Sequence, residues 1–126
     1  MKNNSERRQF LRASLEQFVS ECSGGVVKIA RVIDIGEGGL RYRLPAGPSV
    51  PEGGVVTLEF CLPGRENPIR ARARVKTRRK GNCTTETSVS FLAIGGREAA
   101  EIRSWVVERK RAEIFEYLRR QHLACA

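Results

Sequence analysis

Alternation of apolar and polar residues predicts a series of short β-strands along most of the chain. The clearest case is segment 69–75, where isoleucine, alanine and valine alternate with three arginines, so that one face is apolar and the other basic. Segments 26–34, 40–44, 55–62 and 84–91 alternate in the same way or are rich in β-branched residues. Glycine, proline and asparagine separate these segments, and 45–54 is expected to be a loop. The pattern predicts a mainly β protein, a small antiparallel barrel of about six strands.

The C-terminal quarter of the chain has a different periodicity. After Gly95 and Gly96, residues 97–122 contain neither glycine nor proline, which predicts a long α-helix. One apolar face is expected to pack on the barrel, and a second apolar stripe follows further along. The first face contains Ile102, Trp105 and Val106, and the stripe contains Val107, Ile114 and Leu118. At about 1.5 Å per residue the helix exceeds the width of a small barrel, so we expect its free part to form a weak homodimer or to contact a partner.

The segment before the first clear strand has two interpretations. Leu11, Leu15, Phe18 and Cys22 recur at helical spacing, and two glycines follow them, which predicts a helix over residues 6–22. A strand over residues 13–22 is the other interpretation, which follows from a family resemblance described below.

Composition limits the class of protein. A chain of 126 residues with 40% hydrophobic residues is expected to fold as one domain. No stretch contains the roughly 20 apolar residues that a membrane-spanning helix needs. The first seven residues also lack the apolar core of a signal peptide. We therefore expect a cytoplasmic protein that does not insert into a membrane.

Charge and reactive residues point to binding rather than catalysis. Residues 65–81 contain eight basic residues and one glutamate, and so supply +7 of the net charge of +9. Such a segment can attract a polyanion, but we favour an exposed hairpin face that keeps the protein soluble. The four cysteines are scattered, and His122 is the single histidine, so we expect no metal site. No nucleophile, base and acid stand in a recognisable catalytic pattern, so we expect no enzyme.

Two short motifs indicate a ligand. Arg8 and Arg12 lie four positions apart and follow Arg7, and 22 positions after Arg12 comes Asp34, followed by Gly36 and Gly39. Guanidinium groups suit phosphate oxygens and the O6/N7 edge of guanine. A carboxylate suits the guanine edge that presents N–H donors, and a glycine turn lets a flat base approach the backbone. Together the motifs predict a receptor for an anionic guanine nucleotide.

In order and spacing these motifs resemble those of the PilZ family of bacterial cyclic di-GMP receptors, which have RxxxR followed by (D/N)xSxxG. The resemblance implies a flexible arginine arm over residues 1–12, a PilZ-type β-barrel over 13–95 with its first strand at 13–22, and a C-terminal helix over 96–123. It also implies a ligand-binding set, in which the arginines clamp cyclic di-GMP and the aspartate contacts guanine. That set consists of Arg7, Arg8, Arg12, Asp34, Gly36 and Gly39.

The resemblance implies a receptor that changes conformation with its ligand and signals to a partner protein, although no motif identifies that effector. With Arg7 the motif resembles the RRxxxR form of that family, and this resemblance implies two cyclic di-GMP molecules per chain. Gly36 stands where the family has serine, so one hydrogen bond is lost, and Gly36→Ser is expected to restore it.

Two alternatives remain. A degenerate PilZ-type adaptor would bind proteins and no nucleotide. A barrel that binds nucleic acid through residues 65–81 is less favoured, because that segment lacks aromatic residues on which bases could stack.

Overall fold

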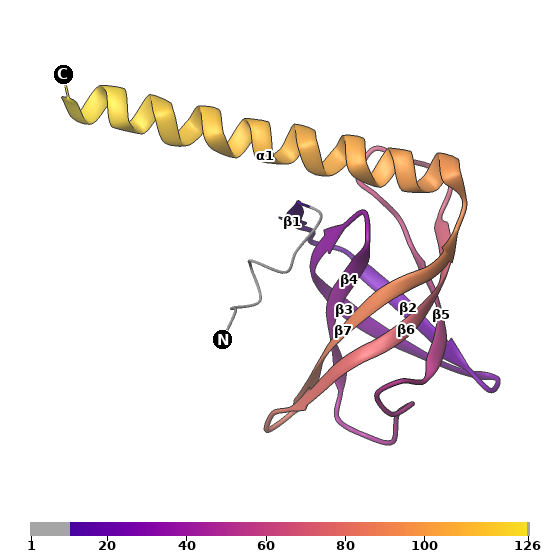
Figure 1. The fold of residues 1–126 in the computed structure, drawn as a ribbon. Coiled ribbons are helices and arrows are strands. Elements are labelled where there is room, and N and C mark those ends of the chain that lie inside the picture. The colour runs from indigo at the N-terminus through magenta and orange to yellow at the C-terminus, as the bar shows by residue number, and fades with distance from the viewer. Residues whose placement is uncertain (1–10, 126) are drawn as a thin grey trace.

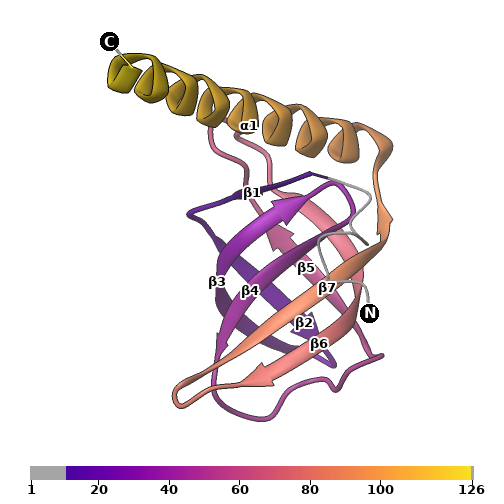
Figure 2. The same ribbon diagram turned by 60° about the vertical axis from the view of Figure 1, so that its left-hand side comes forward.

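The computed structural model describes residues 11–125, which form seven β-strands and one α-helix. The elements are β1 (Arg12–Ser14), β2 (Phe18–Ser23), β3 (Val26–Gly36), β4 (Gly39–Pro45), β5 (Val55–Phe60), β6 (Ile69–Lys80), β7 (Thr84–Ile94) and α1 (Gly96–Cys125). Every strand pairing is antiparallel, and the order β3-β2-β5-β6-β7-β4 closes into a barrel because β4 pairs back with β3 (Figures 1 and 2). This confirms the predicted mainly β barrel with a long C-terminal helix.

The N-terminal part of the described chain forms two strands instead of the single strand expected over residues 13–22. β1 pairs with the last residues of β3, and β2 pairs with its first residues, so both strands lie along the same edge of β3. The helical interpretation of this segment is wrong, because the apolar residues at helical spacing do not share a buried face. Leu15 is buried, whereas Leu11 and Phe18 are exposed. Pairing with β3 therefore outweighs the local periodicity.

The barrel core follows the alternation of the sequence. On β6 the four apolar residues of segment 69–75 point inward and are buried, and the three arginines between them point outward and are exposed. The helix closes one end of the barrel, where Ile102 and Val106 are buried and Trp105 is half-buried, as predicted. The largest fully buried side chains include Tyr42, Leu15, Ile35, Leu40, Leu44, Leu58, Ile69 and Ile102.

A buried polar cluster also lies inside the barrel. The Arg78 guanidinium donates hydrogen bonds from Nη1 and Nη2 to the two carboxylate oxygens of Glu21, each at 3.2 Å, and from Nη1 to Thr87 Oγ1 at 2.9 Å. Tyr42 donates its hydroxyl to the same carboxylate. Burial, and then the neighbouring Glu21, raises the pKa of Tyr42, so the hydroxyl stays protonated and remains a donor.

The basic segment 65–81 is therefore not one uniform exposed face, as the sequence suggested. Arg78 points into the barrel, and its side chain is only 7% exposed. Arg65 forms ion pairs with Glu98 and Glu101 on the helix. The remaining basic residues of the segment are exposed and stay available to solvent.

The helix α1 extends well past the barrel (Figure 1). Its predicted apolar stripe, Val107, Ile114 and Leu118, is exposed, and Phe115 and Tyr117 are exposed beside it. Within the described part of the chain, no helix combines the length and the apolar character needed to cross a membrane.

Candidate functional site

The second motif forms a tight hairpin between β3 and β4. Gly36 and Gly39 face each other as a pair, so that Glu37 and Gly38 alone make the turn. Neither of the paired glycines has a positive φ, so a special backbone torsion is not the reason for them. A Cβ on Gly39 would collide with the carbonyl oxygen of Val89 in β7. Gly39 is therefore required for the close approach of two barrel strands.

Gly36 allows a second close approach, on the other side of the hairpin. A Cβ at this position would lie 2.6 Å from the carbonyl oxygen of Leu11 and 3.1 Å from Cγ of Arg12. Leu11 directly precedes β1, and Arg12 is the first residue of β1 and pairs with Gly36. The glycine thus lets the start of the described chain lie flat against β3.

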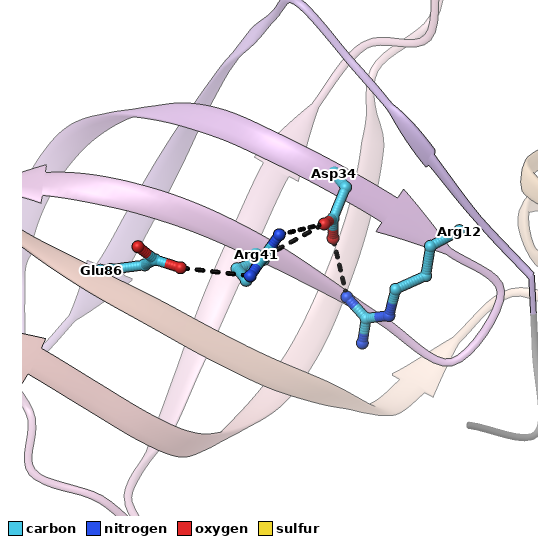
Figure 3. Close-up of polar contacts among 4 residues, drawn as sticks. All are labelled: Arg12, Asp34, Arg41 and Glu86. Carbon is cyan, nitrogen blue, oxygen red and sulfur yellow. Dashed lines mark hydrogen bonds and ion pairs between the residues drawn. The ribbon is translucent and has the colours of Figure 1, made fainter. Parts of the chain in front are cut away.

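Arg12 and Asp34, which lie 22 positions apart in the sequence, meet in this structure (Figure 3). Nη1 of Arg12 donates a hydrogen bond of 2.9 Å to Oδ1 of Asp34. The Asp34 side chain is 13% exposed and the Arg12 side chain 24%, so the pair is partly shielded from solvent. Arg12 is the first residue of β1, so here it belongs to a strand, whereas the sequence analysis assigned it to the flexible arm. The predicted Arg7 and Arg8 lie outside the described residues.

Sequence reasoning missed Arg41, which also binds Asp34. Its Nε and Nη2 donate hydrogen bonds of 3.1 and 2.7 Å to Oδ2 of Asp34, and Nη1 donates one of 3.3 Å to Oε1 of Glu86 in β7 (Figure 3). The hairpin offered a signal for it. A two-residue turn at 37–38 pairs Gly36 with Gly39. Each step back along β3 then pairs with one step forward along β4, so Arg41 lies opposite Asp34.

The outer face of β3 and β4 around this cluster is strongly basic. Arg31 and Arg43 are both exposed and lie directly opposite each other. Arg31 comes three residues before Asp34 in β3, and Arg43 two residues after Arg41 in β4. Like charges in such positions repel each other unless an anion lies between them. Four arginines therefore surround Asp34 and Glu86 on this surface, which suits an anionic ligand.

The hairpin turn is also connected to the helix. Nη1 of Arg103 on α1 donates a hydrogen bond of 2.9 Å to Oε1 of Glu37 in the turn. The helix packs on β1 and β3 as well, and β1 runs between α1 and the end of the barrel (Figure 2). Asp34 and Arg12 thus lie on the two strands that contact the helix, β3 and β1.

The chemistry of this surface is ionic recognition. Guanidinium groups, one carboxylate and a close-packed glycine turn offer hydrogen bonds to a flat, charged ligand. Among residues 11–125, no group of three or more His, Cys, Asp and Glu side chains is placed to hold a metal ion.

Comparison with solved structures shows the same fold in three PilZ-type proteins. The Bacillus subtilis inhibitor of motility (MotI/DgrA) has a TM-score of 0.73 at 18% identity, over 89% of this chain and 57% of that one. The PilZ domain of Escherichia coli YcgR with c-di-GMP has 0.67 at 16%, over 88% and 97%. The K. pneumoniae MrkH–c-di-GMP complex has 0.70 at 16%, over 90% and 55%. The chain thus spans little more than half of the MotI and MrkH chains.

At these identities the structural likeness establishes the fold alone. No curated protein matches the chain in sequence. A family-level comparison is decisive, because residues 6–108 match the PilZ domain, and this range includes both motifs and the whole barrel. The chain belongs to the PilZ domain family.

Proposed function

We propose that this protein is a cyclic di-GMP receptor that binds its ligand on the outer face of β3 and β4, beside Asp34. The observation that supports this most directly is the contact between Arg12 and Asp34. One residue comes from each motif, and the fold brings the two into a hydrogen bond of 2.9 Å. Two of the structural neighbours, the YcgR PilZ domain and MrkH, are described as complexes with c-di-GMP.

The proposed contacts follow from the chemistry of the ligand. Asp34 accepts hydrogen bonds from the N–H groups of one guanine, and Gly36 and Gly39 let the backbones near Leu11 and Val89 pack closely beside it. Arg12, with Arg7 and Arg8 before it, binds the phosphates and the O6/N7 edge of guanine. The surplus of arginines around Asp34 favours the two negative charges of the ligand.

Binding would change the contacts of Arg12. In the free protein its guanidinium is bonded to Asp34, the same carboxylate that the guanine needs. Release of Arg12 from Asp34 would shift β1, which lies against α1 (Figure 2). We propose that this movement alters the surface that a partner protein recognises.

The test is isothermal titration of the protein with cyclic di-GMP. Arg12→Ala and Arg8→Ala should each weaken binding by about 2 kcal/mol, roughly thirtyfold, because each removes a charge-assisted contact. Arg72→Ala is the matched control, since it removes an exposed charge from the outer face of β6 and should leave binding unchanged.

Two results would contradict the proposal. Wild-type affinity in both motif variants would show that the arginines are not the clamp. Absence of binding to the wild type would favour the adaptor that uses protein contacts alone. The close packing of Gly36 on Leu11 is the one observation that favours this adaptor, because it leaves no room for the family's serine.

A further inference from the structure

Asp34 has two carboxylate oxygens, and different parts of the fold hold them. Oδ1 accepts a hydrogen bond from Arg12 in the three-residue strand β1. Oδ2 accepts two from Arg41 in β4, which lies directly opposite Asp34 in the closed barrel. The Arg12 contact can open without disturbing the barrel, whereas the Arg41 contact is fixed by a strand pair that the barrel requires.

Arg41 is in turn held from its far side. Its Nη1 reaches Oε1 of Glu86 in β7, so its guanidinium bridges two carboxylates on neighbouring strands (Figure 3). The planar guanidinium can make both contacts because its donors point along fixed directions. A lysine would keep the charge, but its single ammonium cannot reproduce this bridge.

We propose that Arg41 is a positioning residue for guanine recognition, which holds Asp34 in the orientation that the base requires while Arg12 exchanges with the ligand at Oδ1. This inference rests on the proposed cyclic di-GMP site. A guanine presents two adjacent N–H groups that need both oxygens of a carboxylate in one plane. A carboxylate oxygen accepts about two hydrogen bonds, so a base N–H at Oδ2 takes the place of one of the two Arg41 hydrogen bonds, and the other keeps Asp34 in position.

The role differs from general attraction of an anion. An arginine that merely attracted phosphate would help every cyclic dinucleotide equally, and lysine would replace it. A residue that orients Asp34 helps only a base with the matching donors. Cyclic di-AMP is the suitable comparison, because it has the same phosphates, whereas adenine lacks the paired N–H groups of guanine.

The experiment measures binding of cyclic di-GMP and cyclic di-AMP to the full chain at low salt, for the wild type, Arg41→Lys and Arg41→Ala. We expect both variants to lose about tenfold in cyclic di-GMP affinity, and Arg41→Lys, which keeps the charge, to bind cyclic di-AMP as the wild type does. Arg72→Lys is the matched control, because Arg72 is exposed on the outer face of β6, which β7 separates from β4. It should leave selectivity for guanine unchanged.

Two further variants separate positioning from a fold defect. In the Asp34→Ala background, Arg41→Lys should have no additional effect on cyclic di-GMP, because the carboxylate to be oriented is absent. Glu86→Gln leaves the Arg41–Asp34 contact in place and weakens its support, so a loss of about threefold is expected. Unfolding curves of all variants check that the barrel is intact.

The outcomes are distinct. Wild-type affinity of Arg41→Lys for cyclic di-GMP, or an equal loss for both ligands, would overturn the positioning role while leaving the receptor proposal standing. If Arg41 variants fail to fold, unchanged guanine selectivity in Glu86→Gln would overturn the role. If the wild type binds no cyclic di-GMP, the proposed function fails, and this inference fails with it.

Discussion

At the scale of single residues, Gly36 limits what can be built into the site. From the sequence, serine at this position promised an additional hydroxyl for the ligand. In the structure, any Cβ there meets the Leu11 carbonyl oxygen at 2.6 Å, so a side chain must displace the segment that leads into β1. The serine hydroxyl should strengthen ligand binding, whereas the displacement should destabilise the free protein. The affinity of Gly36→Ser alone would therefore report both effects together.

We predict that Gly36→Ala and Gly36→Ser each destabilise the free protein by about 1–3 kcal/mol through overpacking. Urea unfolding measures this loss. Gly36→Ser should bind cyclic di-GMP up to about tenfold more tightly than Gly36→Ala, because the two differ only in the hydroxyl. Unaltered stability in both variants would show that β1 moves aside freely, and equal affinities would show that the hydroxyl does not reach the ligand.

Arg7 supports a prediction about stoichiometry. It adds a third guanidinium beside Arg8 and Arg12, more than one compact dinucleotide needs. We expect two cyclic di-GMP molecules per chain at saturation, and one in Arg7→Ala. Titration of a protein solution of known concentration measures both end points. An end point of one equivalent in the wild type, or the same end point in both proteins, contradicts the prediction.

At the scale of elements, the two halves of α1 differ in what they contact. Its first half docks on the barrel through Ile102 and Val106, and the Arg103–Glu37 hydrogen bond ties it to the motif turn. Its second half presents exposed apolar side chains, including Ile114, Phe115 and Leu118, without a partner among the described residues. Monomeric proteins seldom leave a large apolar patch in water, so we expect these side chains to meet a partner.

We predict weak antiparallel self-association through residues 107–118 of the helix. An antiparallel arrangement separates the arginines at 111, 119 and 120, which a parallel pair would bring together. Ile114→Glu and Leu118→Glu should abolish the association and leave cyclic di-GMP binding intact, because both positions lie beyond the docked part of the helix. Sedimentation at increasing protein concentration measures the association, and a strict monomer at high micromolar concentration contradicts the prediction.

At the scale of the whole molecule, the buried cluster of Glu21, Arg78, Tyr42 and Thr87 ties β2, β4, β6 and β7 together across the barrel interior. An ion pair at this depth is costly to break from one side, because the remaining charge stays buried without a counterion. Arg78 should therefore contribute to stability far more than the outward arginines of the same strand.

We predict that Arg78→Ala destabilises the protein by about 3–5 kcal/mol, because it leaves the Glu21 carboxylate buried and unpaired. Arg72→Ala, on the same strand but exposed, should change stability by less than about 0.5 kcal/mol. Chemical unfolding of the two variants under one set of conditions makes the comparison. Equal effects would mean that water reaches Glu21 once the arginine is removed.

The sequence by itself determined the barrel, the docked face of the helix and the two motifs. Strict alternation, as in segment 69–75, leaves each strand one way to bury its apolar face, so the elements and their inward residues follow from local pattern. The pairing of Asp34 with Arg41 could also have been predicted from the sequence, because a two-residue turn fixes the register of the hairpin.

Only the tertiary structure decided the remaining features, because they depend on contacts between distant segments. The spacing of Leu11, Leu15 and Phe18 predicts a helix, yet pairing with β3 makes this segment extended. Arg78 resembles its exposed neighbours in sequence, but a register shift between Val75 and Thr77 reverses the alternation of β6, so that Arg78 points inward and pairs with Glu21. The meeting of Arg12 with Asp34 and the tight contact at Gly36 likewise exist only once β1 lies against β3, which no local periodicity specifies.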